Sequence, residues 1–296
     1  MKRACTRVLR EGTGDIAIFV PFTRAWCVDR FFASLAESDV PFHRARFVAY
    51  IDHDDGELAQ AVSDAALAIP FAEVVIHCSA WPPPAEYERT RERRGRHAAM
   101  RCASVGLVPE SAKYLLLLED DTTVPAKTWK TLRADLGKGY DWVCGFEIGR
   151  WRCPCPGIWD MSAPGYRRSA TPGKGLEDAD ATGVYLVLTT PDVYRALPWD
   201  VWDNNYGHDV SITWLLKKAG YRIGVDWSLE CVHMTESGDL TCSMSEPTVN
   251  PRPLPPFAPV LFAHPDVVPF TEFQSCGPER VARKRPLTTG IDRERR

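Results

Sequence analysis

The sequence lacks any long apolar run. No stretch approaches the ~18 apolar residues of a membrane-spanning helix, and the basic N-terminal segment MKRACTRVLREGTGD has no apolar core of the kind found in secretory signal peptides. Neither charge dominates, because 36 lysines and arginines face 39 aspartates and glutamates, for a formal net charge of -3. These absences predict a cytoplasmic protein whose body is not a general binder of polyanions.

Signs of a disulfide framework or a structural zinc site are also missing. The 10 cysteines are scattered through a chain without an export signal, so most are predicted to be reduced core residues. Cys153 and Cys155 stand close together, but their spacing is shorter than that of structural zinc pairs and no second pair follows. A proline-stiffened loop with two free thiols is the preferred interpretation.

No glycine-rich phosphate loop follows the first predicted strand. The segment EGTGD precedes that strand, whereas a dinucleotide-binding fingerprint must follow one. This position argues against a dinucleotide-binding enzyme and against a nucleotidyltransferase with such a loop.

Apolar runs alternate with helical patterns through the first half of the chain. This alternation predicts an α/β fold in a single domain, with right-handed crossovers and a mostly parallel central sheet. The predicted strands cover residues 15–23, 46–52, 72–78 and 114–118, and the predicted helices cover 26–37, 57–67 and 96–107.

The second half has longer connections. Strands are predicted over 140–149 and 181–190, a helix over 209–219 with Gly220 as its C-cap, and a strand that ends near His233. The intervening loop of residues 150–180 is rich in glycine and arginine and is predicted to be a lid ordered by a ligand. Residues 1–245 are predicted to form the catalytic domain, and 246–296 a proline-rich extension with a basic, disordered or docking tail.

Carboxylates end two of the predicted strands. One strand runs into the acids of segment 52–55, and the strand of YLLLL runs into Glu119, Asp120 and Asp121. The carboxyl ends of parallel strands meet at one edge of a sheet, so both clusters are expected to face the same crevice. Packed carboxylates repel one another, and a divalent cation is the expected partner.

The order of these motifs resembles the GT-A glycosyltransferases, especially their family-2-like inverting group. YLLLLEDDTTVPAKTW matches a strand that ends in an acid-any-acid metal motif, followed by a proline and an aromatic residue. GHDVSITWLLKKAGYRIGVDWSLECVHM then matches an acid that opens a helix, an Ala-Gly-Tyr end and a strand leading to a histidine. The resemblance covers roughly residues 15 to 235. It departs from the family pattern at Glu119, where aspartate is usual, and at His208, where glutamate often precedes the catalytic acid.

The resemblance implies a metal site for Mn²⁺ or Mg²⁺ and a nucleotide-sugar donor, expected to be a UDP-sugar. Asp121 would be a direct metal ligand, with Glu119 as a ligand on the nucleotide side and Asp120 as a further donor contact. His233 would be a nitrogen ligand that favours manganese, and Cys231 on the same strand face is its rival.

The remaining donor contacts follow from the same resemblance. Asp52 matches the position that holds the nucleotide base, with Asp54 and Asp55 as alternatives. Arg94 and Arg96 are candidates for bidentate contacts to the donor phosphates, and their alternative is an exposed charged run.

Asp209 is implied to be the general base, because it opens a helix whose dipole keeps a carboxylate ionised. Its presence favours a glycosyltransferase over a non-catalytic module that binds nucleotide-sugars. The acceptor is predicted to be a saccharide or small molecule, and tryptophans that are candidates for stacking on sugar faces or for core packing are Trp151, Trp159, Trp199 and Trp202.

The alternative acceptor is DNA with a hydroxymethylated base flipped into the site. A phosphate backbone would then be held by the basic tail and by a cluster of arginines. The cluster comprises Arg89, Arg91, Arg93, Arg94 and Arg96.

Overall fold

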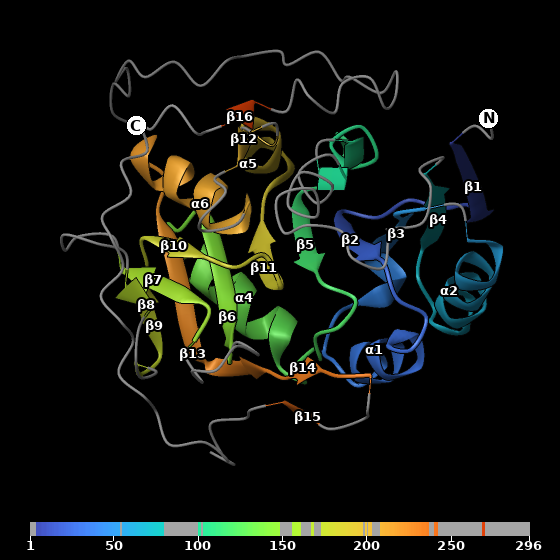
Figure 1. Ribbon diagram of the computed structural model, residues 1–296, viewed down its shortest axis with the longest axis horizontal. Coiled ribbons are helices and arrows are strands. Elements are labelled where there is room, and N and C mark those ends of the chain that lie inside the picture. The colour runs from blue at the N-terminus through green and yellow to red at the C-terminus, as the bar shows by residue number, and fades with distance from the viewer. Residues whose placement is uncertain are drawn as a thin grey trace.

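A computed structural model gives the architecture of the chain. It describes residues 4–53, 55–79, 100–101, 103–148, 156–160, 167–168, 173–197, 199, 201–202, 208–236, 240–241 and 268–269. A large mixed sheet forms the centre of this part of the chain, and helices lie on both of its faces (Figure 1).

The central sheet has nine strands. In chain order they are β1 (Cys5–Arg10), β2 (Ile16–Phe22), β3 (Ala45–Ile51), β4 (Glu73–Cys78), β5 (Tyr114–Leu118), β6 (Trp142–Glu147), β9 (Leu176–Asp178), β11 (Leu186–Thr189) and β13 (Ile223–Cys231). Their order across the sheet is β1-β4-β3-β2-β5-β11-β6-β13-β9.

Small sheets and helices complete the described structure. The short strands are β7 (Ile158–Asp160), β8 (Arg167–Arg168), β10 (Ala181–Thr182), β12 (Val201–Trp202), β14 (His233–Met234), β15 (Leu240–Thr241) and β16 (Val268–Pro269). The helices are α1 (Val28–Ala36), the 3-10 helix η1 (Phe42–Arg44), α2 (Gly56–Ala68), α4 (Thr128–Leu136), α5 (Pro191–Ala196) and α6 (His208–Lys218).

Most strands of the central sheet point the same way, as the alternation of strands and helices predicts. Strands β4, β3, β2 and β5 pair in parallel, and β13 pairs in parallel with β6. Antiparallel β11 lies between β5 and β6, so these two blocks share one direction. Strands β1 and β9 are antiparallel to their neighbours at the two edges of the sheet. The carboxyl ends of β2, β3 and β5 therefore lie side by side, and this end of the parallel strands is named the carboxyl edge.

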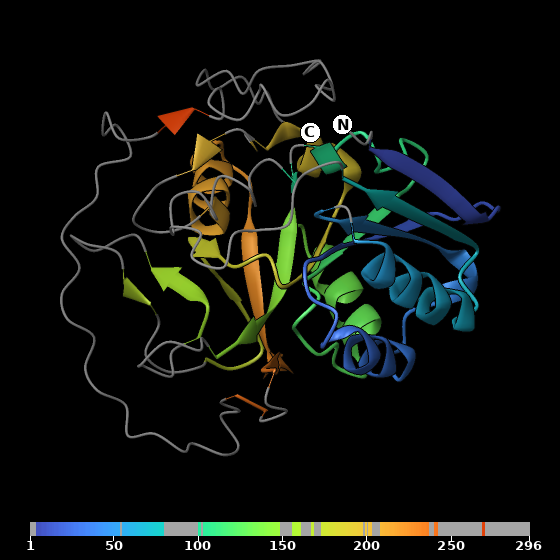
Figure 2. The ribbon, with the colours of Figure 1, turned by 45° about the vertical axis from the view of Figure 1, so that its right-hand side comes forward.

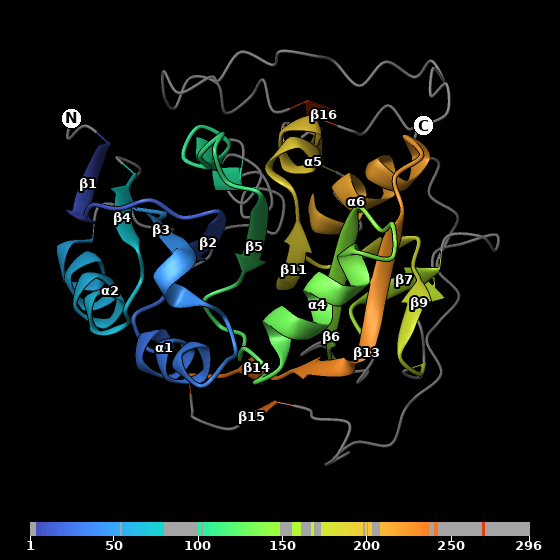
Figure 3. The same cartoon turned by 180° about the vertical axis from the view of Figure 1, so that it is seen from behind.

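Strand β2 shows why the sheet is covered on both faces. All seven of its residues are buried, as expected for a central strand of a sheet flanked by helices. Ile16, Ile18 and Val20 face the core that α1, α2 and α4 cover, whereas Ala17 and Phe19 face the core shared with α5 and α6. Figures 2 and 3 show α1, α2 and α4 grouped on one side of the sheet.

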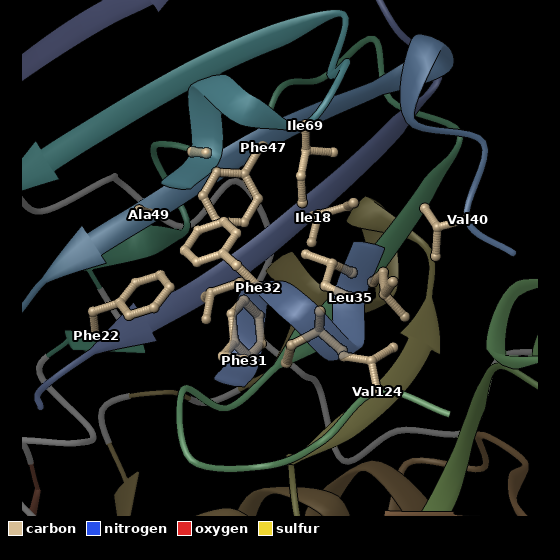
Figure 4. Close-up of a cluster of buried hydrophobic side chains, with 14 of the residues drawn as sticks. Ile18, Phe22, Phe31, Phe32, Leu35, Val40, Phe47, Ala49, Ile69 and Val124 are labelled. Atoms are coloured by element: carbon tan, nitrogen blue, oxygen red, sulfur yellow. The ribbon is translucent and has the colours of Figure 1, made fainter. Parts of the chain in front are cut away.

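A cluster of phenylalanines fixes the end of β2 against α1 (Figure 4). The rings of Phe22 and Phe32 stack with centroids 5.8 Å apart, and Phe31 meets Phe22 edge-on at 5.5 Å. Phe47 of β3 continues the cluster, 5.4 Å from Phe32. Each such pair adds about 0.5–1.5 kcal/mol beyond the burial of its area, so the segment after Phe22 leaves a rigid platform.

Two elements differ from the sequence prediction. Segment 181–190 is not one strand but two, because β10 pairs with β7 in a small sheet while β11 joins the central sheet. Strand β1 was not predicted, because its residues CTRVLR are exposed or half-buried and carry little apolar pattern. The predicted cap at Gly220 is confirmed by its φ of 85°, in the left-handed region that glycine tolerates.

Residues from the predicted C-terminal extension reach the body of the protein. Val268–Pro269 (β16) pairs with Val201–Trp202 (β12). The domain boundary at residue 245 stays a prediction. Within the described ranges, no helix is both long and apolar enough to cross a membrane.

Candidate functional site

Three acids follow β5 at the edge where the parallel strands end. Ligand oxygens of Glu119, Asp120 and Asp121 all lie within 4.8 Å of one another. Asp120 and Asp121 are only 1% and 4% exposed. The sequence prediction that these acids form one cluster is therefore confirmed by their positions.

Asp120 ties this cluster to the end of β2. Its Oδ2 accepts hydrogen bonds from the backbone N–H of Thr23 at 2.7 Å and from the Thr23 hydroxyl at 3.2 Å. Its Oδ1 accepts one from an Nη1 of Arg24 at 2.7 Å, and the same nitrogen lies 2.8 Å from Oδ2 of Asp121. One guanidinium thus bridges two neighbouring carboxylates.

A second guanidinium serves Glu119. Arg101, which is 3% exposed, forms an ion pair with Glu119 and lies 3.5 Å from the carbonyl oxygen of Val184. Its charged group lies over the ring of Phe19 on β2, 5.8 Å from the ring centroid. The backbone N–H of Glu119 donates to the carbonyl of Tyr185 at 3.1 Å. The side chain of Glu119 is therefore held by Arg101, and its backbone by Tyr185.

The electrostatics of the cluster favour additional positive charge. Burial, with smaller contributions from Asp121 and Asp120, raises the pKa of Glu119 to about 7 against the opposing effect of Arg101. Burial likewise raises the pKa of Asp120 to about 6, although Arg24 opposes the shift. Three carboxylates within 4.8 Å of one another repel, and Arg24 and Arg101 offset only part of the shift in these pKa values. Closely spaced carboxylate oxygens are the ligands that a hard divalent cation prefers, so the residues fit such an ion.

His233 lies beside the acids because the backbone pairs there. Thr122 and His233 form a β-bridge, and the N–H of Met234 donates to the carbonyl of Asp121 at 2.7 Å. Nε2 of His233 is 3.6 Å from Oδ1 of Asp121. The rival Cys231 is fully buried, and burial raises the pKa of its thiol well above the usual value, which disfavours a metal-binding thiolate.

Asp209 approaches the same edge from the first turn of α6. Helix α6 is anchored to β10, since the Thr213 hydroxyl donates to the carbonyl of Thr182 at 3.1 Å. A Cβ on Gly183 would lie 3.5 Å from Oδ2 of Asp209 and 2.5 Å from two ring atoms of Tyr185. A side chain at position 183 would therefore collide with the Tyr185 ring and crowd the Asp209 carboxylate, so this position requires glycine.

Segment 183–185 connects Asp209 with the acidic cluster. Gly183 is next to the Asp209 carboxylate, Val184 contacts Arg101, and Tyr185 contacts Glu119 through its carbonyl. Three consecutive residues span only about 7 Å even when extended. The structure thus brings the predicted base and the predicted metal motif to one locality.

Asp52 is a further predicted acid at this edge. It is 4% exposed, pairs with Nδ1 of His53, and its backbone N–H donates to the carbonyl of Phe22 at 3.2 Å. The alternative Asp55 caps α2 instead, because its Oδ1 accepts from the N–H groups of residues 57 and 58, each at 3.0 Å. The other alternative, Asp54, lies outside the described residues.

Two residues that the sequence singled out are structural. Trp199 is 2% exposed, and its ring packs 4.5 Å from that of Tyr194 and 5.6 Å from that of His208. Of its two candidate roles, stacking on a sugar or core packing, the burial of its ring supports core packing. His208 is itself buried, with Nε2 3.2 Å from the carbonyl of Trp199.

Several predicted residues lie outside the part of the chain that the structure describes, and their roles stay predictions. They are Arg94 and Arg96, the other arginines of segment 89–93, the thiols Cys153 and Cys155, Trp151, most of the 150–180 loop, and the basic tail.

Sequence reasoning missed three charged residues that the structure places around the acids. Arg24, Arg101 and Glu147 each contact a predicted site residue. The available signal was the charge imbalance itself, because three adjacent buried acids require cations nearby. Nothing in the local sequence indicates which arginines supply them.

The sequence matches no protein-family profile and no curated protein. Among solved structures, GalNAc-T7 with UDP, GalNAc and Mn²⁺ aligns at 14% identity with a TM-score of 0.54, over 76% of this chain and 44% of that one. The mannosyltransferase PcManGT from Pyrobaculum calidifontis aligns at 13% identity and TM-score 0.49, over 74% and 56%. Residues 1–349 of S. aureus TarS align at 13% and 0.48, over 71% and 57%.

The chain thus spans less than half of GalNAc-T7 and less than two thirds of the other two proteins. At this level of identity the similarity concerns the arrangement of strands and helices. Together with the sheet order and the acidic motif after β5, it shows that the chain has the GT-A glycosyltransferase fold.

Proposed function

We propose that the chain is a metal-dependent glycosyltransferase that moves a sugar from a nucleotide-sugar, with a UDP-sugar as the expected donor, to an acceptor hydroxyl with inversion. The observation that carries this proposal is the convergence of Glu119, Asp120 and Asp121 within 4.8 Å, beside a segment that leads directly to Asp209. The structure of GalNAc-T7, which has the same fold, contains UDP, GalNAc and Mn²⁺.

Asp121, Glu119 and His233 would hold the metal, which is Mn²⁺ or Mg²⁺. Such an ion, when bound, neutralises charge that develops on a leaving diphosphate. Asp120 has a different part in this proposal, because its oxygens already accept hydrogen bonds from Thr23 and Arg24. It keeps the end of β2 in place against the metal motif.

The donor would lie along the edge formed by β3, β2 and β5. Asp52 would contact the nucleotide base. Arg24, which bridges Asp120 and Asp121 of the metal motif, would place positive charge near the phosphates. Arg94 and Arg96 stay candidates for further phosphate contacts.

Asp209 would accept the proton of the acceptor hydroxyl. Its place in the first turn of α6 favours the ionised carboxylate, since the helix dipole is positive there. Gly183 leaves space at the carboxylate that a larger residue would fill. A base positioned in this way supports a single displacement, in which the acceptor oxygen attacks the anomeric carbon as the bond to the diphosphate breaks.

The acceptor is proposed to be a saccharide or small molecule. The DNA alternative stays a prediction, because the arginines on which it depends lie outside the described residues. A cytoplasmic location also stays a prediction.

A screen of nucleotide-sugar hydrolysis tests the proposal. Purified protein is incubated with UDP-, GDP- and TDP-sugars in Mn²⁺ or in excess chelator, and released nucleotide is measured. We expect hydrolysis of one donor class in Mn²⁺ and none in chelator, with loss in Asp121→Ala. Asp192→Ala serves as the control, because its side chain is 98% exposed on α5. Full activity in chelator, or failure of every donor to bind or react, would exclude this function.

A further inference from the structure

The sheet register places Glu147 next to His233. Strands β6 and β13 are parallel, and Glu147 is paired with Cys231. His233 follows two residues later, and alternate residues of an extended chain project to the same side. The neighbourhood of the two side chains is therefore set by the backbone.

The backbone around Glu147 is itself fixed. Its carbonyl accepts a hydrogen bond from the N–H of Gly157 at 2.9 Å, and the next residue, Ile148, forms a β-bridge with Pro156. Glu147 is 8% exposed. The Glu147 carboxylate is therefore nearly buried on a strand whose backbone is fixed.

The imidazole of His233 lies between two carboxylates. Nδ1 is 3.1 Å from Oε2 of Glu147, an ion-pair distance at which the two groups are not aligned as a hydrogen bond, and Nε2 is 3.6 Å from Oδ1 of Asp121. A neutral imidazole has one nitrogen that donates and one that accepts. Because Asp121 belongs to the proposed metal site, the acceptor nitrogen has to be Nε2 if His233 binds the ion.

We propose that Glu147 is a positioning residue for this metal site: it accepts the Nδ1 proton of His233 and so directs the Nε2 lone pair toward the ion beside Asp121. The inference rests on the proposed function, since it assigns a supporting residue to the same metal. Carboxylates that orient metal-binding histidines in this way fix the tautomer and raise the basicity of the ligand. Glu147 itself contacts neither the ion nor the donor.

The test measures Mn²⁺ binding directly, without donor and without turnover, by the electron paramagnetic resonance signal of free Mn²⁺. Glu147→Met removes the acceptor while keeping the side-chain length, and we expect affinity to fall by about 10- to 100-fold. Glu147→Gln keeps an acceptor oxygen and should lose less. Glu73→Gln is the matched control, because Glu73 is a strand carboxylate paired with Arg46 at 3.2 Å on β4.

A double-mutant cycle separates positioning from general structural support. His233→Phe should weaken Mn²⁺ binding, and adding Glu147→Met to it should cause no further loss, because Glu147 acts through His233. If Glu147→Met does not fold, the same comparison is made with Glu147→Gln. As an independent readout, the ¹⁵N resonances of the metal-free protein should show His233 protonated at Nδ1, and this preference should be lost in Glu147→Met.

The outcomes distinguish the two proposals. If Asp121→Ala and His233→Phe weaken Mn²⁺ binding but removal of the Glu147 carboxylate does not, the positioning role is wrong and the proposed function stands. Equal losses on substituting Glu147 with and without His233 would also overturn the positioning role. If the unaltered protein binds no Mn²⁺, the proposed function fails first.

Discussion

A cluster of three carboxylates and a pair of carboxylates lie at opposite ends of the parallel strands, and the two are neutralised differently. At the carboxyl edge, the acidic cluster of residues 119–121 contacts two arginines. Toward the start of β13, Asp226 lies close enough to Asp135 of α4 to raise its pKa, and Nζ of Lys138 is 2.8 Å from Oδ1 of Asp135. The Lys138 side chain is 59% exposed, whereas Arg101 is 3% exposed.

The contrast indicates what each arrangement can do. Desolvation and the contact with Asp226 raise the pKa of Asp135, so two carboxyl groups in contact retain a proton more readily. At the carboxyl edge, cations from two distant segments keep three acids within 4.8 Å of one another. A proton can relieve the repulsion between Asp135 and Asp226, whereas the acidic cluster of residues 119–121 is suited to a divalent cation.

The largest difference between the two sites is expected from replacing one aspartate of each by asparagine. Asp121→Asn should lower turnover by about 1,000-fold or more, because the several kcal/mol of charge stabilisation supplied through a metal site are lost. Asp135→Asn should leave turnover unchanged. Steady-state transfer assays in saturating Mn²⁺ compare them, and equal losses in the two variants would remove the distinction between the sites.

The next effect concerns the acid opposite the cluster. Asp209→Asn should lower turnover by about 100- to 10,000-fold with little change in donor affinity, because the amide keeps the shape but cannot accept a proton. If Asp209 only stabilised the start of α6, asparagine would be nearly silent, since the two residues cap helices equally well. Near-native turnover, or a product that retains the donor's anomeric configuration, would contradict the role as base.

The cations should differ in their contribution to folding. Arg101→Met leaves Glu119, whose side chain is 23% exposed, without its ion-pair partner and should lower the free energy of unfolding by about 1–3 kcal/mol. Lys138→Met should have little effect on the unfolding midpoint, because its charge is exposed and solvent-screened. Thermal unfolding in chelator measures both, and comparable losses would show that burial of the cation is not the decisive difference.

Metal and pH should act together at the carboxyl edge only. The folded-state pKa values of Glu119 and Asp120, about 7 and 6, are above their ordinary values of 4.5 and 3.8. Proton binding therefore favours the folded state, and stability present below pH 4 is lost as pH rises through 6 to 7. In chelator the unfolding midpoint should fall between pH 5 and 8, and saturating Mn²⁺ should abolish most of this fall. A pH response that is the same with and without Mn²⁺ would argue against an ion at these acids.

The smallest effect is expected from the carboxyl pair. Because the folded-state pKa of Asp135 is raised above 3.8, its ionisation disfavours the folded state at neutral pH, and this cost is absent below pH 3.8. Asp135→Asn should therefore raise the unfolding midpoint at pH 7, by about 2–4 °C for each kcal/mol of repulsion removed. The gain should shrink on acidification. A midpoint lowered at pH 7 would show that the contact with Lys138 outweighs the repulsion.

Local pattern was sufficient for much of the fold. Apolar runs predicted β2, β3 and β5, because burial on both faces requires such runs, and the acids that end the last two predicted their common edge. Strand β1 was missed because an exposed edge strand has no such requirement. The division of 181–190 into two strands depends on the pairing of β10 with β7, which is a tertiary contact.

The site was predicted in its acids and missed in their partners. Glu119, Asp120, Asp121 and His233 were identified from motif order, and the structure places them together. Arg24 contacts Asp120 from 96 positions away in the sequence. Which cation meets which acid is decided by chain topology, so it could not be read from composition or spacing. Trp199 illustrates the same limit: its core and sugar-stacking roles both stayed open, because the sequence around an aromatic residue does not distinguish a core from a binding cleft.

The antiparallel position of β1 has a consequence for handling the protein. Strand β1 covers the hydrogen-bonding edge of β4, with Arg7 and Arg10 among its own exposed or half-buried residues. Charged residues on an outer strand discourage pairing with other molecules. Without β1 the outer strand would be β4 (EVVIHC), which is mostly apolar. Trimming the chain at residue 12 would therefore expose a template for intermolecular strand addition, and loss of solubility would precede any loss of the ability to fold.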